Sequence, residues 1–309
     1  MLRFKPLSPL PIPMRRPPTL LAALAAVCAL TVFVSPVAAA DAPPQAPSAA
    51  LDRIKRAATI HFAYREGAAP FSFKDRGGRA RGYSVELCSR VAAAIQKDLG
   101  LPALKVEWTP VTAATRIPAV TSGKADAECG TTTITLTRMQ SVDFSVPIYV
   151  DGGTVLVDVK SKLSRLADLK GKRVAVIGGT TTEQALKRAL EQIGAAAVLV
   201  PVKDGDTGVA LLTQGKVDGY AGARVVLAGF RNSAPDPNAL EFIGGDFSFE
   251  PYALVVPRTD PDFRLAVNRA LVHLYKSGEI DEIFQRWLGG LGEPGPLLHS
   301  MFYLNTLPE

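Results

Sequence analysis

Two successive series of short strands that alternate with helices constrain the fold of this chain more than any other feature. The first series has strands at 59–64 and 105–108 around a helix at 84–99. The second series contains an apolar strand at 173–177 followed by a helix at 183–193. Alternation of this kind is typical of mostly parallel sheets flanked by helices. The 309 residues suit about two domains of ~150 residues each. We therefore predict an α/β protein with two lobes, each built on its own sheet.

The first forty residues differ from the rest of the chain. They contain four basic residues, no acidic residue and an apolar run from Leu20 to Val34. This run of 15 residues is shorter than the roughly 17–25 apolar residues that a membrane-spanning helix needs. A basic start, an apolar middle and a small-residue end at Ala38-Ala39-Ala40 are typical of a cleaved export signal. We predict a signal peptide over residues 1–40 and a Pro/Ala-rich linker over residues 41–50.

The predicted signal peptide also accounts for most of the net positive charge of the chain. Four of the 35 basic residues and none of the 29 acidic residues lie in it, and the formal charge of the whole chain is +6. The excess that remains is too small for the electrostatic footprint of a nucleic-acid-binding protein. We therefore expect no nucleic-acid partner.

Two of the three cysteines, Cys88 and Cys129, remain after the signal is removed. An exported protein reaches an oxidising compartment, where a disulfide between them would persist. Two separately buried thiols are the alternative. The sequence leaves both interpretations open.

A hydroxyl-rich segment follows a strand in each series. Residues 129–133 follow a short strand at 125–128 and precede Arg138, whose planar guanidinium can bind a carboxylate through two parallel bonds. Residues 178–182 begin the helix of the second series, where exposed backbone N–H groups favour anions. In open α/β sheets, ligands bind outside the carboxyl ends of the strands. Plain turns and helix caps without a ligand would show the same residue types.

A set of short motifs occurs in a characteristic order along the chain. The motifs are Arg65-Glu66, Pro70-Phe71-Ser72, Gly82-Tyr83-Ser84, Arg116-Ile117-Pro118, Glu128-Cys129-Gly130-Thr131-Thr132-Thr133 with Arg138, Val142-Asp143-Phe144-Ser145, Asp168-Leu169-Lys170-Gly171 and Gly179-Thr180-Thr181. No single motif is specific, but the ordered set resembles the periplasmic amino-acid-binding proteins of ABC importers, and most closely their glutamate/aspartate-binding branch. The resemblance covers about residues 55–290. It implies a two-lobed periplasmic-binding-protein fold of type II and a location in the periplasm.

The resemblance also implies ligand-binding roles for individual residues. Arg138 is expected to bind the α-carboxylate of the ligand, and Arg65 and Arg116 match the arginines that mark the acidic branch. Further contacts are expected from the following residues: Thr131 and Thr133 in the first lobe, Thr180 and Thr181 in the second lobe, and Phe71 at the pocket floor. The alternation of Phe71 with Phe73 also fits a half-buried strand.

One position departs from the family pattern. Ala223 stands where the family has an aspartate that binds the ligand's ammonium, and Arg224 follows it. A buried ammonium without a partner costs on the order of several kcal/mol. Either another acid substitutes, with Asp204, Asp206 and Glu66 as candidates, or the ligand lacks an ammonium. Arg224 would favour a more negative ligand.

The interpretation that we favour is a periplasmic receptor that delivers an acidic amino acid to the permease of an ABC transporter. A receptor for an amine-free carboxylate or dicarboxylate is the second possibility. A cyclohexadienyl dehydratase-like enzyme is a remote third one, with Glu66 and Glu183 as its possible acids. The sequence shows no Ser-His-Asp set and no zinc-ligand spacing, so we expect no catalytic residue, no cofactor and no metal. We expect a monomer.

The order of the elements predicts how the chain divides between the lobes. Residues 51–149 and 250–309 are expected to form lobe 1, and residues 150–249 are expected to form lobe 2. The chain would cross between the lobes near residues 149–151 and 249–251. These two crossings would act as a hinge that closes the lobes over the ligand.

Overall fold

The computed structural model describes residues 48–308. The predicted signal peptide and most of the predicted linker lie outside these residues. The first helix, α1 (Ala49–Ala57), begins inside the segment predicted as linker, because the Ser48 side chain accepts a hydrogen bond from the Leu51 backbone N–H and caps the helix. Every helix within residues 48–308 is too short or too polar to cross a lipid bilayer.

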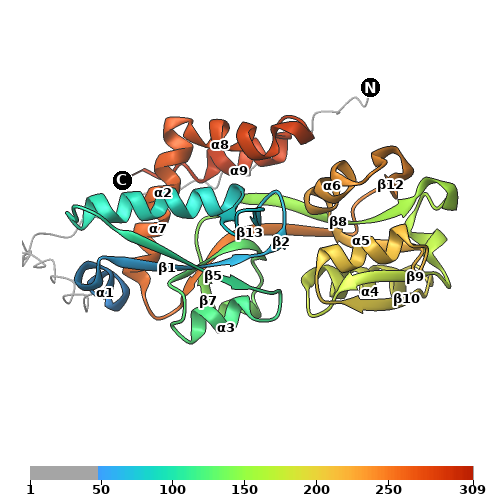
Figure 1. Ribbon diagram of the computed structural model, residues 1–309, viewed down its shortest axis with the longest axis horizontal. Helices are drawn as coiled ribbons and strands as arrows, with labels where there is room; N and C mark the ends of the chain where they lie inside the picture. The colour runs from blue at the N-terminus through green and yellow to red at the C-terminus, as the bar shows by residue number, and fades with distance from the viewer. Residues whose placement is uncertain (1–47, 309) are drawn as a thin grey trace, which may run out of the picture. The chain divides into compact units, whose positions relative to one another are not determined.

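The helices and strands follow the predicted alternation (Figure 1). After α1, the helices are α2 (Tyr83–Asp98), α3 (Arg116–Thr121), α4 (Thr181–Gln192), α5 (Gly205–Thr213), α6 (Arg224–Ser233), α7 (Pro261–Ser277), α8 (Glu279–Leu288) and α9 (Pro296–Leu304). The strands are β1 (Thr59–Arg65), β2 (Gly67–Ala68), β3 (Ser72–Lys74), β4 (Ala80–Arg81), β5 (Lys105–Val111), β6 (Ala127–Thr133), β7 (Val142–Phe144), β8 (Tyr149–Asp158), β9 (Arg173–Ile177), β10 (Val198–Val202), β11 (Gly219–Ala223), β12 (Leu240–Phe242) and β13 (Ser248–Pro257). Short 3-10 helices lie at Arg138–Gln140, Val159–Ser161, Leu166–Leu169, Pro237–Ala239 and Gly289–Leu291.

The structure differs from the predicted elements in two places that matter for the argument. Residues 129–133, predicted as a loop, continue strand β6, because their backbone pairs with β13 and Thr133 lies opposite Tyr252. The Gly- and Pro-rich segment after α8, whose composition predicts no helix, leads into helix α9, which begins with Pro296, a residue whose fixed φ suits the first turn of a helix.

The main sheet follows one hydrogen-bonded path in the order β10-β9-β11-β8-β13-β6-β1-β5, with β12 paired to β8 and β7 paired to β13, whereas β2, β3 and β4 form a separate small sheet. β1 pairs in parallel with β5 and β6, and β9 pairs in parallel with β10 and β11. We call these two groups the β1 side and the β9 side. β8 and β13 run antiparallel to each other between the two groups, as Figure 1 shows. The two predicted sheets are therefore joined into one path, because the strands at the two chain crossings are neighbours and their backbones pair.

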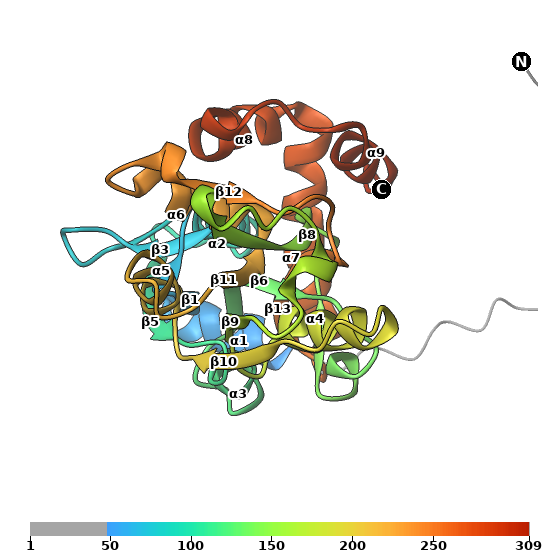
Figure 2. The ribbon, with the colours of Figure 1, turned by 90° about the vertical axis from the view of Figure 1, so that its right-hand side faces the viewer.

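Both faces of the β9 side are covered, which explains the unbroken apolar sequence of β9. Val174 and Val176 point to one face and pack with Leu186 of α4, whereas Ala175 points to the other face and packs with Leu212 of α5. Figure 2 shows α4 and α5 on opposite sides of β9. A strand buried on both faces has no polar positions to alternate with apolar ones.

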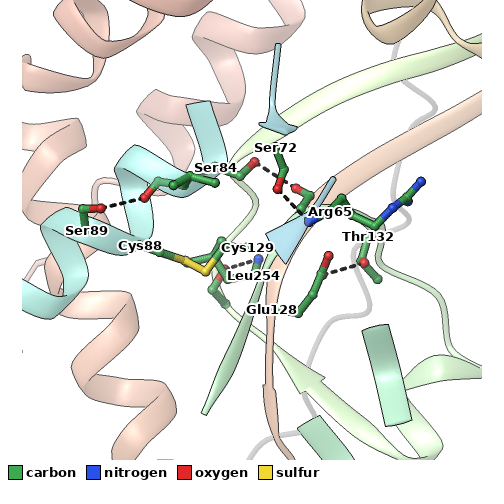
Figure 3. Close-up of a disulfide and its surroundings, with 12 residues drawn as sticks. Arg65, Ser72, Ser84, Cys88, Ser89, Glu128, Cys129, Thr132 and Leu254 are labelled. Atoms are coloured by element: carbon green, nitrogen blue, oxygen red, sulfur yellow. Dashed lines mark hydrogen bonds between the residues drawn. A yellow bond between two sulfur atoms is a disulfide. The ribbon is translucent and has the colours of Figure 1, made fainter. Parts of the chain in front are cut away.

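The β1 side has its own apolar core and a covalent link. Its largest apolar cluster joins β1 to α2, α7 and α8 through residues such as Phe62, Leu87 and Phe263. A disulfide connects Cys88 on α2 with Cys129 on β6 (Figure 3). The bond confirms the disulfide interpretation over that of two separate thiols. It fixes α2 against the strand that carries the hydroxyl-rich segment.

Candidate ligand-binding site

A cavity is lined by residues from both the β1 side and the β9 side. Its lining residues are Arg65, Gly67, Ala68, Arg116, Thr131, Thr133, Ile177, Thr180, Thr181, Thr182, Tyr220, Ala221, Gly222, Ala223, Val226 and Tyr252. Arg65 ends β1 and Thr133 ends β6, whereas Ile177 ends β9 and Thr181 begins α4. The cavity therefore lies at the carboxyl ends of the parallel strands, where ligands bind in sheets of this kind.

Two buried guanidinium groups form one wall of this cavity. Arg65 is 7 % exposed and Arg116 is 3 % exposed. Burial and the neighbouring charge of Arg116 lower the pKa of Arg65 to about 10, and burial also lowers the pKa of Arg116. The shifts mean that each arginine lies in an environment that disfavours a positive charge. An anion in the cavity would stabilise the positive charge of both arginines.

The fully buried Glu128 carboxylate accompanies these arginines but does not satisfy them. Its Oε2 accepts a hydrogen bond of 2.7 Å from the Thr132 hydroxyl (Figure 3), and its charge raises the pKa of both Arg65 and Arg116. Among the described residues, Glu128 Oε1 and Arg116 Nε are the buried side-chain polar atoms without a hydrogen-bond partner. Both guanidinium groups interact with Glu128, and Arg116 also interacts with the Glu250 carboxylate, yet burial still lowers the pKa of both arginines.

Gly130 makes this arrangement possible. A Cβ atom at this position would lie 2.1 Å from Glu128 Oε1 and 2.9 Å from Arg65 Cγ. The side chains of Arg65 and Glu128 thus occupy the space that any larger residue at position 130 would need. The glycine in the hydroxyl-rich segment is required for packing of the charged wall.

A second polar group lies where β6, α4 and β13 meet. Glu250 on β13 is 2 % exposed, and its Oε2 accepts hydrogen bonds from the hydroxyls of Thr133 and Thr181, the latter at 2.8 Å. Its Oε1 accepts a bond of 3.0 Å from the Ser248 hydroxyl. Three hydroxyl donors therefore hold one buried carboxylate, which links the end of β6 to the start of α4.

Arg138 lies beside this group, although it is not among the residues that line the cavity. Its Nη1 donates a hydrogen bond of 2.7 Å to the Thr133 carbonyl. Burial and the charge of Arg116 lower its pKa to about 10, against the opposing charge of Glu250. A guanidinium has five N–H donors, so a single bond to Thr133 leaves capacity for a carboxylate.

The start of α4 serves the fold and the cavity at once. The Thr180 hydroxyl accepts from the Glu183 backbone N–H at 3.2 Å and donates to the Ile177 carbonyl at 2.8 Å. Glu183 in turn accepts from the Gly179 backbone N–H at 2.7 Å. Thr180 and Glu183 are thus engaged as helix caps, whereas the Thr181 hydroxyl faces Glu250.

Besides Arg138, two further predicted site residues do not line the cavity. Phe71 is fully buried and packs edge-on against Tyr83, Tyr149 and Tyr252, so it supports the cavity wall from behind through Tyr252. Arg224 forms a salt bridge of 2.6 Å with Asp246 and stacks over the Phe242 ring. These partners are distant in sequence, so motif order alone could not reveal them.

The candidate substitutes for the missing aspartate are also absent from the cavity lining. Glu66 is exposed and pairs with Lys74, Asp204 caps α5 through Thr207, and Asp206 is exposed. The structure instead brings in residues that the sequence reasoning did not single out, namely Tyr220 and Tyr252 in the lining and Asp151 and Glu250 beside it. For Asp151 and Glu250, the sequence signal that could have revealed them is an acidic residue within an otherwise strand-like apolar run.

Tyr220 is held against the cavity by two glycines of α5. A Cβ atom at Gly208 would lie 2.5 Å from the Tyr220 ring, and one at Gly205 would lie 2.3 Å from the Phe230 ring. The aromatic rings thus fill the space above these glycines. Tyr220 is 1 % exposed, and burial raises the pKa of its phenol against the lowering effect of the Arg65 charge.

Comparison with known proteins gives a consistent result. A model of the bacterial extracellular solute-binding proteins, family 3, matches residues 60–290. The L-glutamate/L-aspartate-binding protein of Pseudomonas aeruginosa is 34% identical over 238 residues, which is 77% of this chain and 79% of that protein. The glutamate/aspartate import solute-binding protein of Escherichia coli is 31% identical and covers 85% of this chain and 86% of its own length.

A solved structure also resembles this chain closely. It is that of an ancestral amino acid-binding protein described as a precursor of cyclohexadienyl dehydratase. It aligns with a TM-score of 0.67 at 30% identity, over 77% of this chain and 98% of that one. The likeness confirms the predicted two-lobed α/β fold.

Proposed function

Because the chain belongs to the bacterial extracellular solute-binding proteins of family 3, we propose that it is a periplasmic receptor that delivers an acidic amino acid to the permease of an ABC importer. The proposed ligand is of the glutamate or aspartate kind, as the names of the relatives from P. aeruginosa and E. coli suggest. The chain covers most of the length of both relatives, which supports a receptor role for it as a whole.

The observation that carries the proposal is the pair of buried arginines, Arg65 and Arg116, in one cavity wall. A guanidinium matches a carboxylate in shape and charge. Arg65, Arg116 and the nearby Arg138 outnumber the two protein carboxylates that act on them, Glu128 and Glu250, which leaves positive charge for a ligand carboxylate. A ligand with two carboxylates would use all three cations.

We propose that binding closes the two lobes over this ligand. The lobes would be residues 51–149 with 250–309, and residues 150–249, and the paired strands β8 and β13 would be the hinge. Cavity walls from both the β1 side and the β9 side support this division. A ligand-dependent decrease in the radius of gyration, measured by small-angle scattering, is expected.

A receptor for an amine-free dicarboxylate is the second candidate. The cavity-lining residues in the described part of the chain include no aspartate or glutamate, and Ala223 is among them. A dicarboxylate would leave no ammonium to satisfy, which is the advantage of this candidate. It would bind the same three arginines.

The test is a binding screen on the purified mature chain. Isothermal titration with glutamate, aspartate, succinate, glutarate and arginine, in one buffer at one salt concentration, covers both candidates and a cationic control. An acidic amino acid is expected to bind and arginine is not. A thermal shift should accompany binding, since ligand at a hundredfold excess over Kd stabilises by about 2.7 kcal/mol. NMR of the same mixtures is expected to show no new product, and turnover would favour the dehydratase-like enzyme instead.

A further inference from the structure

Two buried carboxylates face each other at the strands that join the two sides. Asp151 on β8 lies directly opposite Glu250 on β13, two positions along from the Tyr149–Tyr252 pair. Directly opposite residues of an antiparallel pair point to the same face, and residues two positions apart do so as well. Tyr252 lines the cavity. Asp151 and Glu250 therefore lie on the face of the paired strands that carries the cavity wall.

The Asp151 side chain lies beside the cavity wall. Its Oδ2 accepts a hydrogen bond of 3.3 Å from the backbone N–H of Val225, and Ala223 and Val226 both line the cavity. The same oxygen lies 3.5 Å from the hydroxyl of Tyr252, another lining residue. Asp151 therefore hydrogen-bonds to one lining residue, Tyr252, and to Val225, the chain neighbour of another, Val226.

The hydrogen bonds of Asp151 leave acceptor capacity unused. A carboxylate has about four lone-pair sites. Asp151 has one short bond, 2.8 Å from the Gly152 backbone N–H to Oδ1, and two long ones. Asp151 has this unused capacity although it is buried, with 8 % of its surface exposed. Glu250, by contrast, is held by three hydroxyls, so it is the better satisfied of the two carboxylates.

We infer that Asp151 is the carboxylate that binds the ammonium of an amino-acid ligand in this cavity. This inference rests on the proposed function and adds the group that recognises the amine. The ligand would lie with its carboxylates toward Arg65, Arg116 and Arg138 and its ammonium toward the paired strands. The arginines and Asp151 thus provide complementary charges for a zwitterion with an acidic side chain.

The charges around Asp151 make this recognition depend on pH. Burial is the main cause that raises the pKa of Asp151 to about 7; the carboxylates of Asp246 and Glu250 act in the same direction, and the N–H groups of Gly152 and Val225 act against it. The other titratable neighbours are Tyr149 and Tyr252, whose own pKa values are raised, and Asp246 is itself paired with Arg224. An ammonium would favour the ionised form of Asp151. Only that ionised fraction binds the amine well.

The sharpest test compares ligands that differ only by the amine. Glutamate and glutarate form one such pair, and aspartate and succinate form another. In Asp151→Asn, titration calorimetry is expected to show an affinity for glutamate weaker by about 30-fold or more, the loss of a buried charge pair. The affinity for glutarate should change less than about threefold. Asp98→Asn, at an exposed acid on α2, is the matched control and should bind both ligands as the wild type does.

The wild-type pH profile gives a second measure that needs no variant. The Kd for an amine-bearing ligand should rise about tenfold per pH unit below about pH 7, and the Kd for its amine-free partner should not. Equal losses for glutamate and glutarate in Asp151→Asn would mean a structural role and overturn the inference, as would an unchanged affinity for glutamate. If the wild type binds only amine-free acids, the inference about Asp151 is wrong, but the proposed receptor function still stands. If the wild type binds an amino acid that is not acidic, only the proposed ligand class is wrong. The inference about Asp151 is then tested by the affinity of Asp151→Asn for that amino acid.

Discussion

The hydroxyl oxygens of Thr133 and Thr181 lie 3.1 Å apart, and both hydroxyls donate to the carboxylate of Glu250. Thr133 ends β6 and Thr181 begins α4, so one buried carboxylate connects the β1 side to the β9 side. The same two threonines line the cavity. The contact between the two sides and the binding surface thus share side chains.

Removal of one of these hydroxyls should weaken the contact measurably. Thr181→Val keeps the shape of the side chain but leaves Glu250 with two hydroxyl donors. We expect the free energy of unfolding to fall by about 1–2 kcal/mol, the typical cost of one hydrogen bond to a buried charged group. Denaturant titration measures the change. Thr213→Val, at an exposed position on α5, is the control and should change stability by less than about 0.5 kcal/mol.

Arg138 is expected to bind a ligand carboxylate. Arg138→Ala should weaken binding of an acidic amino acid by about 2–5 kcal/mol, or roughly 30- to several-thousand-fold in Kd, because a charge-assisted pair in a desolvated site is lost. Titration calorimetry on the folded variant measures this, with Arg79→Ala at an exposed ion pair as the control. Unchanged affinity in a folded Arg138→Ala protein would show that Arg138 does not contact the ligand.

Gly130 should tolerate no side chain. In Gly130→Ala the new methyl group would overlap Glu128 Oε1 and press on Arg65, so both side chains must move. We expect a loss of about 1–3 kcal/mol in stability, as for overpacking in a core, together with weaker ligand binding. Gly290→Ala has open space around its Cβ position and serves as the control. A Gly130→Ala protein as stable as the wild type would contradict the packing of Glu128 on the glycine.

The raised pKa of Asp151 predicts how stability varies with pH. The pKa is 3.8 in the unfolded chain and about 7 in the folded protein, so between these values the folded state binds the proton more tightly. Stability from this group is therefore present at low pH and decreases as pH rises from about 4 to about 7. We therefore expect the unfolding free energy of the wild type, measured without ligand, to fall relative to that of Asp151→Asn as pH rises over this range. A constant difference would contradict the raised pKa.

Much of the fold was predictable from local sequence. The apolar run of β9 and the Thr180 cap that opens α4 are local signals, and the structure has both elements close to their predicted places. The order of the motifs also identified six of the residues that line the cavity, from Arg65 to Thr181. These residues follow strands, and the carboxyl ends of parallel strands gather at one edge.

The remaining features depend on pairing between distant segments. Arg224 looks like a cavity residue in sequence, but Asp246 and Phe242 hold its guanidinium elsewhere. Asp151 and Glu250 are acids within strand-like runs, and only the register of β8 against β13 places them face to face. Residues 129–133 read as a loop until the β13 partner is known. Register is a property of two strands together, so neither sequence alone contains it.

Because the α5 glycines contact Tyr220, residues outside the cavity lining influence the size of the cavity. Gly205 and Gly208 lie against the Phe230 and Tyr220 rings, and neither glycine is among the cavity-lining residues. A methyl group at Gly208 would displace the ring of the lining residue Tyr220 and change the size of the cavity, whereas a smaller residue in place of Tyr220 would enlarge it. Substitutions in α5 are therefore expected to change the length of ligand that the cavity accepts while Arg65, Arg116 and Arg138 stay unchanged.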